Sequence, residues 1–133
     1  MDADPGRGSP EDHALSHVVA RLRAASQALG HRVDTGADGL GNDMAVIHRR
    51  LVDVDRLVAA LVASSDPMDP ATRMARHDLM NALGAIDNYA ELIAVDHAQA
   101  ATEAEAVRAA VRDIVTRVRA TAEAEAEADL NTP

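Results

Sequence analysis

The chain has 133 residues and a formal net charge of −9, a length that corresponds to one domain. Its acidic balance disfavours nucleic acid as a partner, because phosphate backbones repel a negative surface. Cysteine is absent, so disulfides and thiolate metal sites are excluded. No segment reaches the ~20 apolar residues of a membrane span, and no signal peptide is evident. We therefore expect a cytoplasmic protein without membrane contacts.

The core must be built without large aromatic side chains. Phenylalanine and tryptophan are absent, and Tyr89 is the single tyrosine. Aromatic side chains bury ~150–250 Å² each, so aliphatic residues and methionine must fill the interior. Such a core suits the narrow seams between packed helices. Because small chains bury a limited share of their surface, a homodimer is expected, with a monomeric four-helix bundle as the alternative.

The first predicted helix follows a short N-terminal segment, residues 1–8, that we expect to be disordered. Ser9 and Pro10, followed by two acidic residues, form a helix start signal. Apolar residues then recur at helical spacing until Gly30, which is expected to end the helix. They are Leu15, Val18, Val19, Leu22, Ala25 and Leu29.

The second predicted helix is capped by Asn42, after a glycine-rich loop over residues 31–41, and ends before a turn over residues 64–68. Its apolar residues alternate at spacings of three and four, as in a coiled coil. We expect this seam to be exposed and to favour dimerisation. Residues 9–63 therefore form an N-terminal helical pair. The seam consists of Met44, Ile47, Leu51, Val54, Val58 and Leu61.

The third predicted helix is capped by Asp69, opens with Pro70 and runs to about Val95. Residues 102–105 have the capping-box pattern that opens a fourth helix, so residues 69–127 form an antiparallel hairpin, with 128–133 as a disordered tail. The predicted fold is all-α, with this hairpin in a four-helix bundle. The apolar stripes are Leu79, Leu83, Ile86, Ala90 and Ile93 in the third helix, and Val107, Val111, Ile114, Val118 and Thr121 in the fourth.

His77 stands out within the third helix. It lies about 200° around the helix from Leu79, so it faces away from the apolar stripe. An exposed imidazole can act as a nucleophile or a proton shuttle near pH 7. Asp78 can orient one ring nitrogen, and Asn81 lies one turn onward. The candidate partner-binding residues nearby are Arg73, Arg76, Met80, Gly84 and Asn88.

A solvated surface residue is the ordinary alternative for any exposed helical histidine. We assign that role to the other five, and we predict no metal site. His13 and His17 have the i, i+4 spacing of a metal-binding pair, but no third ligand is evident. The five are His13, His17, His31, His48 and His97.

Residues 74–93 resemble the H-box, the phosphoacceptor motif of the dimerisation and histidine-phosphotransfer domain of sensor histidine kinases. The resemblance implies that His77 is phosphorylated, that Asp78 assists the transfer, and that Asn81 positions water or the phosphoryl group. Arg73 and Arg76 lie close enough to offset phosphate charge. The matching residues, in order and spacing, are His77, Asp78, Leu79, Asn81, Leu83, Ile86, Tyr89, Glu91 and Leu92.

The chain also departs from that family. Ala82 replaces the usual proline, which predicts an unkinked helix, and Met80 replaces the usual arginine. Monomeric histidine-containing phosphotransfer proteins are a weaker match, since their lysine and glycine correspond to Met80 and Asn81. No phosphate-cradling glycine motif of an ATP site occurs, so we do not expect an autonomous kinase.

Three functions remain open from the sequence. The first is a phosphotransfer module that exchanges a phosphoryl group with the aspartate of a response-regulator receiver domain. It binds no cofactor itself, with Mg²⁺ on the receiver and a separate histidine kinase as a second partner. The second is a non-catalytic dimerisation or signal-transmission module with a degenerate H-box. The third is a receiver phosphatase that uses Asp78 and Asn81.

Overall fold

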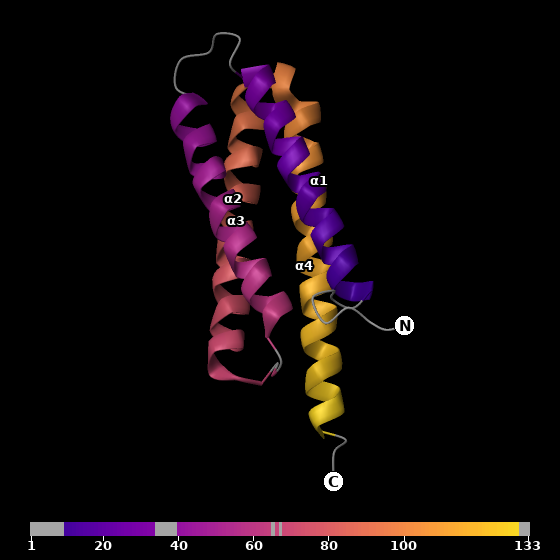
Figure 1. Ribbon diagram of the computed structural model, residues 1–133. Helices are drawn as coiled ribbons and strands as arrows, with labels where there is room; N and C mark the ends of the chain where they lie inside the picture. Colours follow the sequence, from indigo (N-terminus) through magenta and orange to yellow (C-terminus); the bar gives the residue numbers. More distant parts are fainter. Residues whose placement is uncertain (1–9, 34–39, 65, 67, 131–133) are drawn as a thin grey trace, which may run out of the picture.

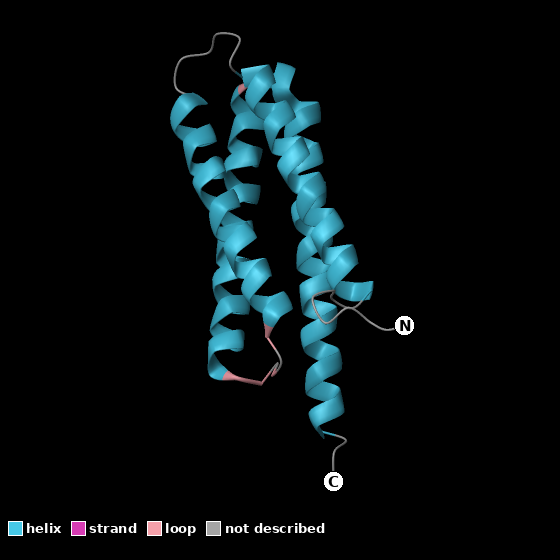
Figure 2. Ribbon diagram, in the orientation of Figure 1, coloured by secondary structure: helices cyan, strands magenta, loops and turns pink. Residues whose placement is uncertain are grey.

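The computed structural model describes residues 10–33, 40–64, 66 and 68–130. Figure 2 shows that these residues are almost entirely helical, and they contain no strand. The predicted all-α fold class is confirmed. The elements are α1 (Pro10–Val33), α2 (Leu40–Ala63), α3 (Pro70–Asp96), the short 3₁₀ helix η1 (Ala98–Ala100) and α4 (Ala101–Leu130).

The four α-helices pack side by side, each antiparallel to the next (Figure 1). α2 packs on α3, α3 on α4 and α4 on α1, while α1 and α2 are neighbours that touch each other less than any of these three pairs. One chain therefore supplies all the helices of a four-helix bundle. Within the described ranges, no helix is both long and apolar enough to cross a membrane.

The predicted apolar stripes meet inside the bundle. The whole stripe of α3 is buried, as are most of the stripes of α1 and α4. The seam of α2 is largely buried too, so the expectation that this seam is exposed is wrong, while the expected homodimer stays a prediction. The hairpin of α3 and α4 needs a cover for its apolar face, and α2 with α1 supplies it within the same chain. The buried seam residues of α2 are Met44, Ile47, Val54 and Val58.

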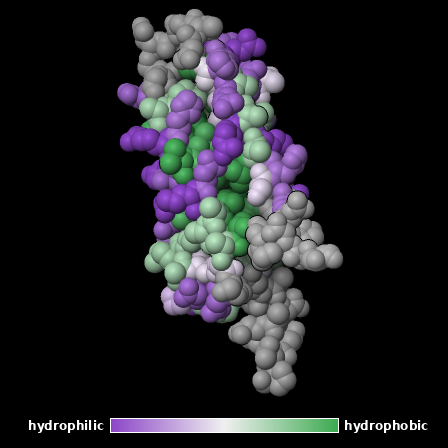
Figure 3. Space-filling model, viewed as in Figure 1, coloured by the Kyte–Doolittle hydropathy of each residue, from purple (hydrophilic) through white to green (hydrophobic). Residues whose placement is uncertain are grey.

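The side of the bundle formed by α1 and α2 is its least tightly packed. Figure 3 shows hydrophobic side chains in the middle of this face, bordered by hydrophilic ones. Leu15 of α1 and Leu51 and Val62 of α2 are only partly buried. An ion pair between Arg23 and Asp55 joins the two helices.

Two predicted helix ends in the first half of the chain are wrong. α1 continues through Gly30 to Val33, because Val33 is buried in the core and holds the last turn in place. α2 begins at Leu40, so Asn42 lies inside the helix and is not its cap. The predicted loop is thus shorter at both ends. Its remainder, residues 34–39, lies outside the described residues, as do the predicted Ser9 cap and the segment 1–8.

In the second half of the chain, the start of α3 agrees with the prediction, but the other predicted helix boundaries differ from the structure. α3 begins at Pro70, although the Asp69 side chain makes no capping hydrogen bond. α4 begins at Ala101, directly after η1, so Thr102 is not its cap. Thr121 is exposed and donates to the Arg117 carbonyl at 3.0 Å, so it does not extend the core stripe. Residues 128–130, predicted as part of the tail, are helical; residues 131–133 lie outside the described chain.

Ser26, in the middle of α1, carries a fully buried hydroxyl with no hydrogen-bond partner among the described residues. An unsatisfied buried hydroxyl costs roughly 1–3 kcal/mol. We expect Ser26→Ala to raise the free energy of unfolding by about 1 kcal/mol, measured by urea denaturation. Ser16→Ala in the same helix, at an exposed position, controls for helix propensity. A gain no larger than that of Ser16→Ala would contradict the expectation.

Candidate functional site

His77 lies about two turns into α3, near the end of the bundle where α2 leads into α3 (Figure 1). Its side chain is 69% exposed, and its Nδ1 lies 3.5 Å from Oδ1 of Asp78, whose side chain is 50% exposed. That distance is long for a hydrogen bond, so the carboxylate lies beside the ring and both groups remain open to solvent.

The predicted site residues form one row along the outer face of α3. Arg73, His77, Asn81, Gly84 and Asn88 recur every three or four positions, and all are exposed. This spacing stacks their side chains turn upon turn. The structure thus brings these five together.

The three remaining predicted residues lie beside this row. Met80 is partly buried and packs against the core, so it is less available to a partner than expected. Arg76 is also partly buried and already interacts within the molecule. Asp78 is exposed and contacts the ring of His77. The sequence did not distinguish the accessibility of these three residues.

Exposed apolar side chains on the same helix face were missed from the sequence. Met74, one turn before His77, is 59% exposed, and Val95 near the other end of α3 is 75% exposed. Leu92 lies beside Val95 and is exposed as well. Leu92 and Val95, one turn apart, form an exposed apolar patch of the kind that often marks an interaction surface, and Met74 lies about 27 Å from Leu92 along the helix. Met74, Leu92 and Val95 lie three, fifteen and eighteen residues from His77. This helical spacing is the sequence signal that could have placed them on the same side of the helix.

The turn before α3 is fixed by hydrogen bonds. The hydroxyls of Ser64 and of buried Thr72 lie 2.6 Å apart. The backbone N–H of Met68 donates to the Asp66 carboxylate at 3.0 Å. These contacts set where α3 starts, and hence where His77 stands on the surface.

An ionic cluster holds the other half of α3 against α4. Arg108 donates from Nε to the Asp87 carboxylate at 3.0 Å and lies within 4.0 Å of Glu91. The hydrogen bond to Asp87 raises the pKa of Arg108. On α4 itself, the hydrogen bond from Arg112 lowers the pKa of Glu105. The cluster keeps Asp87 turned toward α4 and away from the row of exposed residues.

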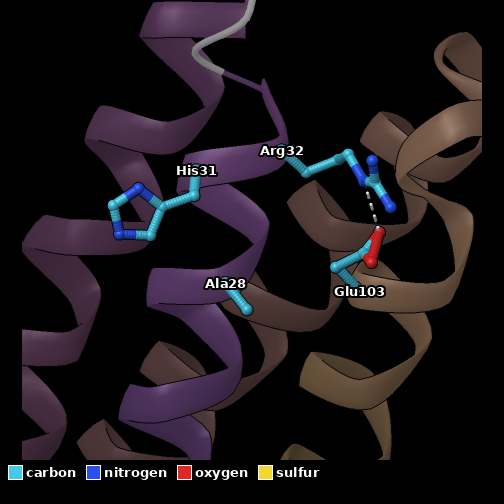
Figure 4. Close-up of a pocket in the computed structure, with 4 residues that line it drawn as sticks. All are labelled: Ala28, His31, Arg32 and Glu103. Carbon is cyan, nitrogen blue, oxygen red and sulfur yellow. Dashed lines mark hydrogen bonds and ion pairs between the residues drawn. The ribbon is translucent and has the colours of Figure 1, made fainter.

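A pocket of about 430 Å³ lies at the opposite end of the bundle, lined by Ala28, His31, Arg32 and Glu103. Figure 4 shows Arg32 and Glu103 pointing toward each other, with Nε and Oε1 3.3 Å apart, while His31 points away from the pair. Because the pair neutralises its own charges, the pocket presents no net charge to a ligand from these two groups. Nowhere in the described ranges do three potential metal ligands gather.

The chemistry available at His77 is that of an accessible nucleophile. An imidazole open to solvent can bond to an electrophilic group that a partner brings to it. Asp78 can stabilise the positive ring that results, and the outer face of α3 offers a surface on which the partner can rest. No family model, curated protein or solved structure matches this chain.

Proposed function

We propose that this chain is a histidine phosphotransfer module, which passes a phosphoryl group between His77 and the aspartate of a response-regulator receiver domain. The observation that supports this most is the exposed imidazole of His77, beside a carboxylate, on a helix that resembles the H-box. The resemblance to the H-box does not by itself require His77 to be accessible. The exposure of its ring therefore supports the proposal independently of the resemblance.

The transfer is a displacement at phosphorus. Nε2 of His77 attacks the phosphorus of the aspartyl phosphate and forms a P–N bond, while the P–O bond to the aspartate breaks and its carboxylate leaves. The ring keeps its proton on Nδ1 and becomes positive, and Asp78, 3.5 Å away, offsets that charge. The reverse step regenerates the aspartyl phosphate. Such reactions depend on positioning and electrostatics, with Mg²⁺ on the receiver neutralising phosphoryl oxygens.

Two neighbours of His77 have supporting roles in this proposal. Arg73, one turn before His77, is exposed and has no ion pair within the described chain, so its guanidinium is available to the phosphoryl oxygens. Asn81, one turn after, can hydrogen bond to the phosphoryl group or to a water molecule. The phosphoryl group enters from a receiver or from a separate histidine kinase.

The test starts from a receiver domain carrying a radiolabelled aspartyl phosphate. The full chain is added, and we expect label to move onto it in a form that is labile in acid and stable in alkali, as phosphohistidine is. Label that stays on the receiver would contradict the proposal. Label released as inorganic phosphate, in a manner lost in Asn81→Ala and kept in His77→Ala, would select the phosphatase function instead.

Gly84 offers a second prediction. It lies on the outer face of α3, where the receiver would dock, and a methyl group there would meet nothing within 4 Å. We expect Gly84→Ala to raise the free energy of unfolding by about 1 kcal/mol and to slow transfer from the receiver, since the methyl group obstructs docking. Urea denaturation and the transfer assay measure the two effects.

Gly30→Ala is the matched control for Gly84→Ala. Gly30 also lies inside a helix, and a methyl group there would make ordinary contacts at 3.5 Å with Met44 and 3.9 Å with His48. It should gain similar stability and leave transfer unchanged. Equal transfer rates in the two variants would exclude the outer face of α3 at Gly84 as the docking surface.

A further inference from the structure

The side of the bundle that α1 and α2 form leaves apolar side chains open to solvent. These two helices touch each other less than the other neighbouring pairs of α-helices do. Leu15, Leu51 and Val62 are only partly buried on this side, and Val52 of α2 is 67% exposed. Figure 3 shows the resulting hydrophobic strip, bordered by hydrophilic side chains. A contiguous apolar strip often marks an interaction surface.

Two contacts show how α1 and α2 are aligned along this side. Arg23 of α1 forms an ion pair with Asp55 of α2, near the middle of both helices. Gly30, two turns further along α1, lies beside His48, two turns back along α2, since a Cβ added at Gly30 would be 3.9 Å from the ring. The antiparallel helices thus stay aligned over this stretch, and Arg23 and Asp55 lie at the same height.

This equal height makes the side complementary to a second copy of itself. When two copies meet face to face about a twofold axis parallel to the helices, α1 of each copy lies over α2 of the other. Arg23 of one copy then lies opposite Asp55 of the other, and the symmetry repeats the contact. Four charges of alternating sign therefore meet at the centre of the contact.

The other arginines of α2 lie at the rim of this side, where interfaces are ordinarily polar. Arg50 and Arg56 lie 3.4 and 3.7 Å from Asp53, while Arg49 is exposed. All three arginines stand about 100° or more around α2 from Asp55. They therefore border the contact and do not enter it.

We propose that two copies of this chain pair through their α1–α2 sides, with α1 of each copy on α2 of the other. The contact covers Val52 and brings Arg23 of each copy to Asp55 of the other. A side about 27 Å long and about 20 Å wide offers roughly 540 Å² per copy, less than the ~800 Å² of a standard interface. We therefore expect a weak dimer, with a dissociation constant of about 1–100 μM.

This inference is independent of the proposed function. His77 lies on the outer face of α3, and α3 packs on α2 and α4, so the dimer leaves that face open. Labelling of His77 should therefore be the same in a monomeric variant as in the wild type.

The test is the mass of the full chain in solution, measured by sedimentation equilibrium from about 1 μM to about 1 mM. The wild type should pass from monomer to dimer, and Val52→Glu should remain a monomer because it places a charge inside the contact. Leu92→Glu, at an exposed apolar position on α3, is the matched control and should dimerise as the wild type does. A monomeric wild type, or a Val52→Glu variant no more disrupted than Leu92→Glu, would overturn the proposal.

Reversing charges tests the symmetry of the contact. Asp55→Arg should weaken dimerisation by about tenfold or more, because it places four arginines together. Combining it with Arg23→Asp restores opposite charges and should restore the dimer. The pair is exposed and contributes little to folding, so both variants should keep the wild-type circular dichroism. A double variant that dimerises as weakly as Asp55→Arg would contradict the proposed contact.

The orientation is tested by disulfide formation, since the chain has no cysteine of its own. Gln27 is exposed and lies midway between Arg23 and Gly30 on α1, at about the height of Val52 on α2. Disulfides need Cβ atoms about 4 Å apart, so Gln27→Cys and Val52→Cys chains, mixed and oxidised, should join mainly to each other. Mixed products no more abundant than chance pairing predicts would overturn the parallel arrangement.

Discussion

Replacing His77 by glutamine is expected to abolish phosphoryl transfer to this chain. Glutamine is close to histidine in size and can hydrogen bond, but its amide nitrogen has no available lone pair and cannot attack phosphorus. The fold should be unaffected, since the His77 side chain is 69% exposed and Asp78 is its recorded partner. The measurement is labelling of the variant by a phosphorylated receiver, and by a histidine kinase with ATP.

The control for His77→Gln is His17→Gln, which alters an exposed histidine on α1. It should be labelled like the wild type, and both variants should unfold at the wild-type urea concentration. Labelling that persists in His77→Gln would assign the phosphoacceptor to another residue. Loss of labelling in both variants would indicate that the effect is not specific to His77.

Ala82→Pro is expected to destabilise the bundle by about 3 kcal/mol, even though proline is the residue that the resembled motif carries there. Ala82 is 2% exposed and lies in the middle of the unbroken helix α3. Proline would remove the backbone hydrogen bond to the Asp78 carbonyl and its ring would collide with that carbonyl. The kink would also displace Leu79 and Leu83, both fully buried.

Urea denaturation followed by circular dichroism measures this loss. Ala82→Gly is the matched control, because it removes the methyl group and retains the N–H; it should cost about 1 kcal/mol. Equal losses in the two variants would mean that packing of the methyl group, and not continuity of the helix, determines stability at residue 82. An undiminished stability in Ala82→Pro would show that α3 tolerates a kink beside His77.

The helix ends were the least predictable part of the fold. Gly30, Asn42 and Thr102 each satisfy a local rule for a helix end, yet all three lie inside helices. Local capping energies amount to about 1 kcal/mol, and burial of a side chain such as Val33 outweighs them. Pro70 succeeded as a start signal because its missing N–H prevents the helix from continuing unstrained into the turn before it.

The candidate site was more predictable than its surroundings. Helical spacing alone placed His77, Asn81 and Gly84 on one outward face, because the spacing depends only on backbone geometry. It did not reveal that Met74 is exposed while Met80 is partly buried. Both lie three residues from His77, and only the position of the neighbouring helices distinguishes them.

By itself the sequence determined the four helices, the apolar stripe of each and the outward position of His77. These follow from periodicity, which is local. Only the tertiary structure decided that the seam of α2 is covered within the chain, and that Arg108 of α4 turns Asp87 away from the outer face of α3. Such pairings join residues far apart in the chain, and their free energy depends on how whole helix faces fit together, which no local spacing specifies.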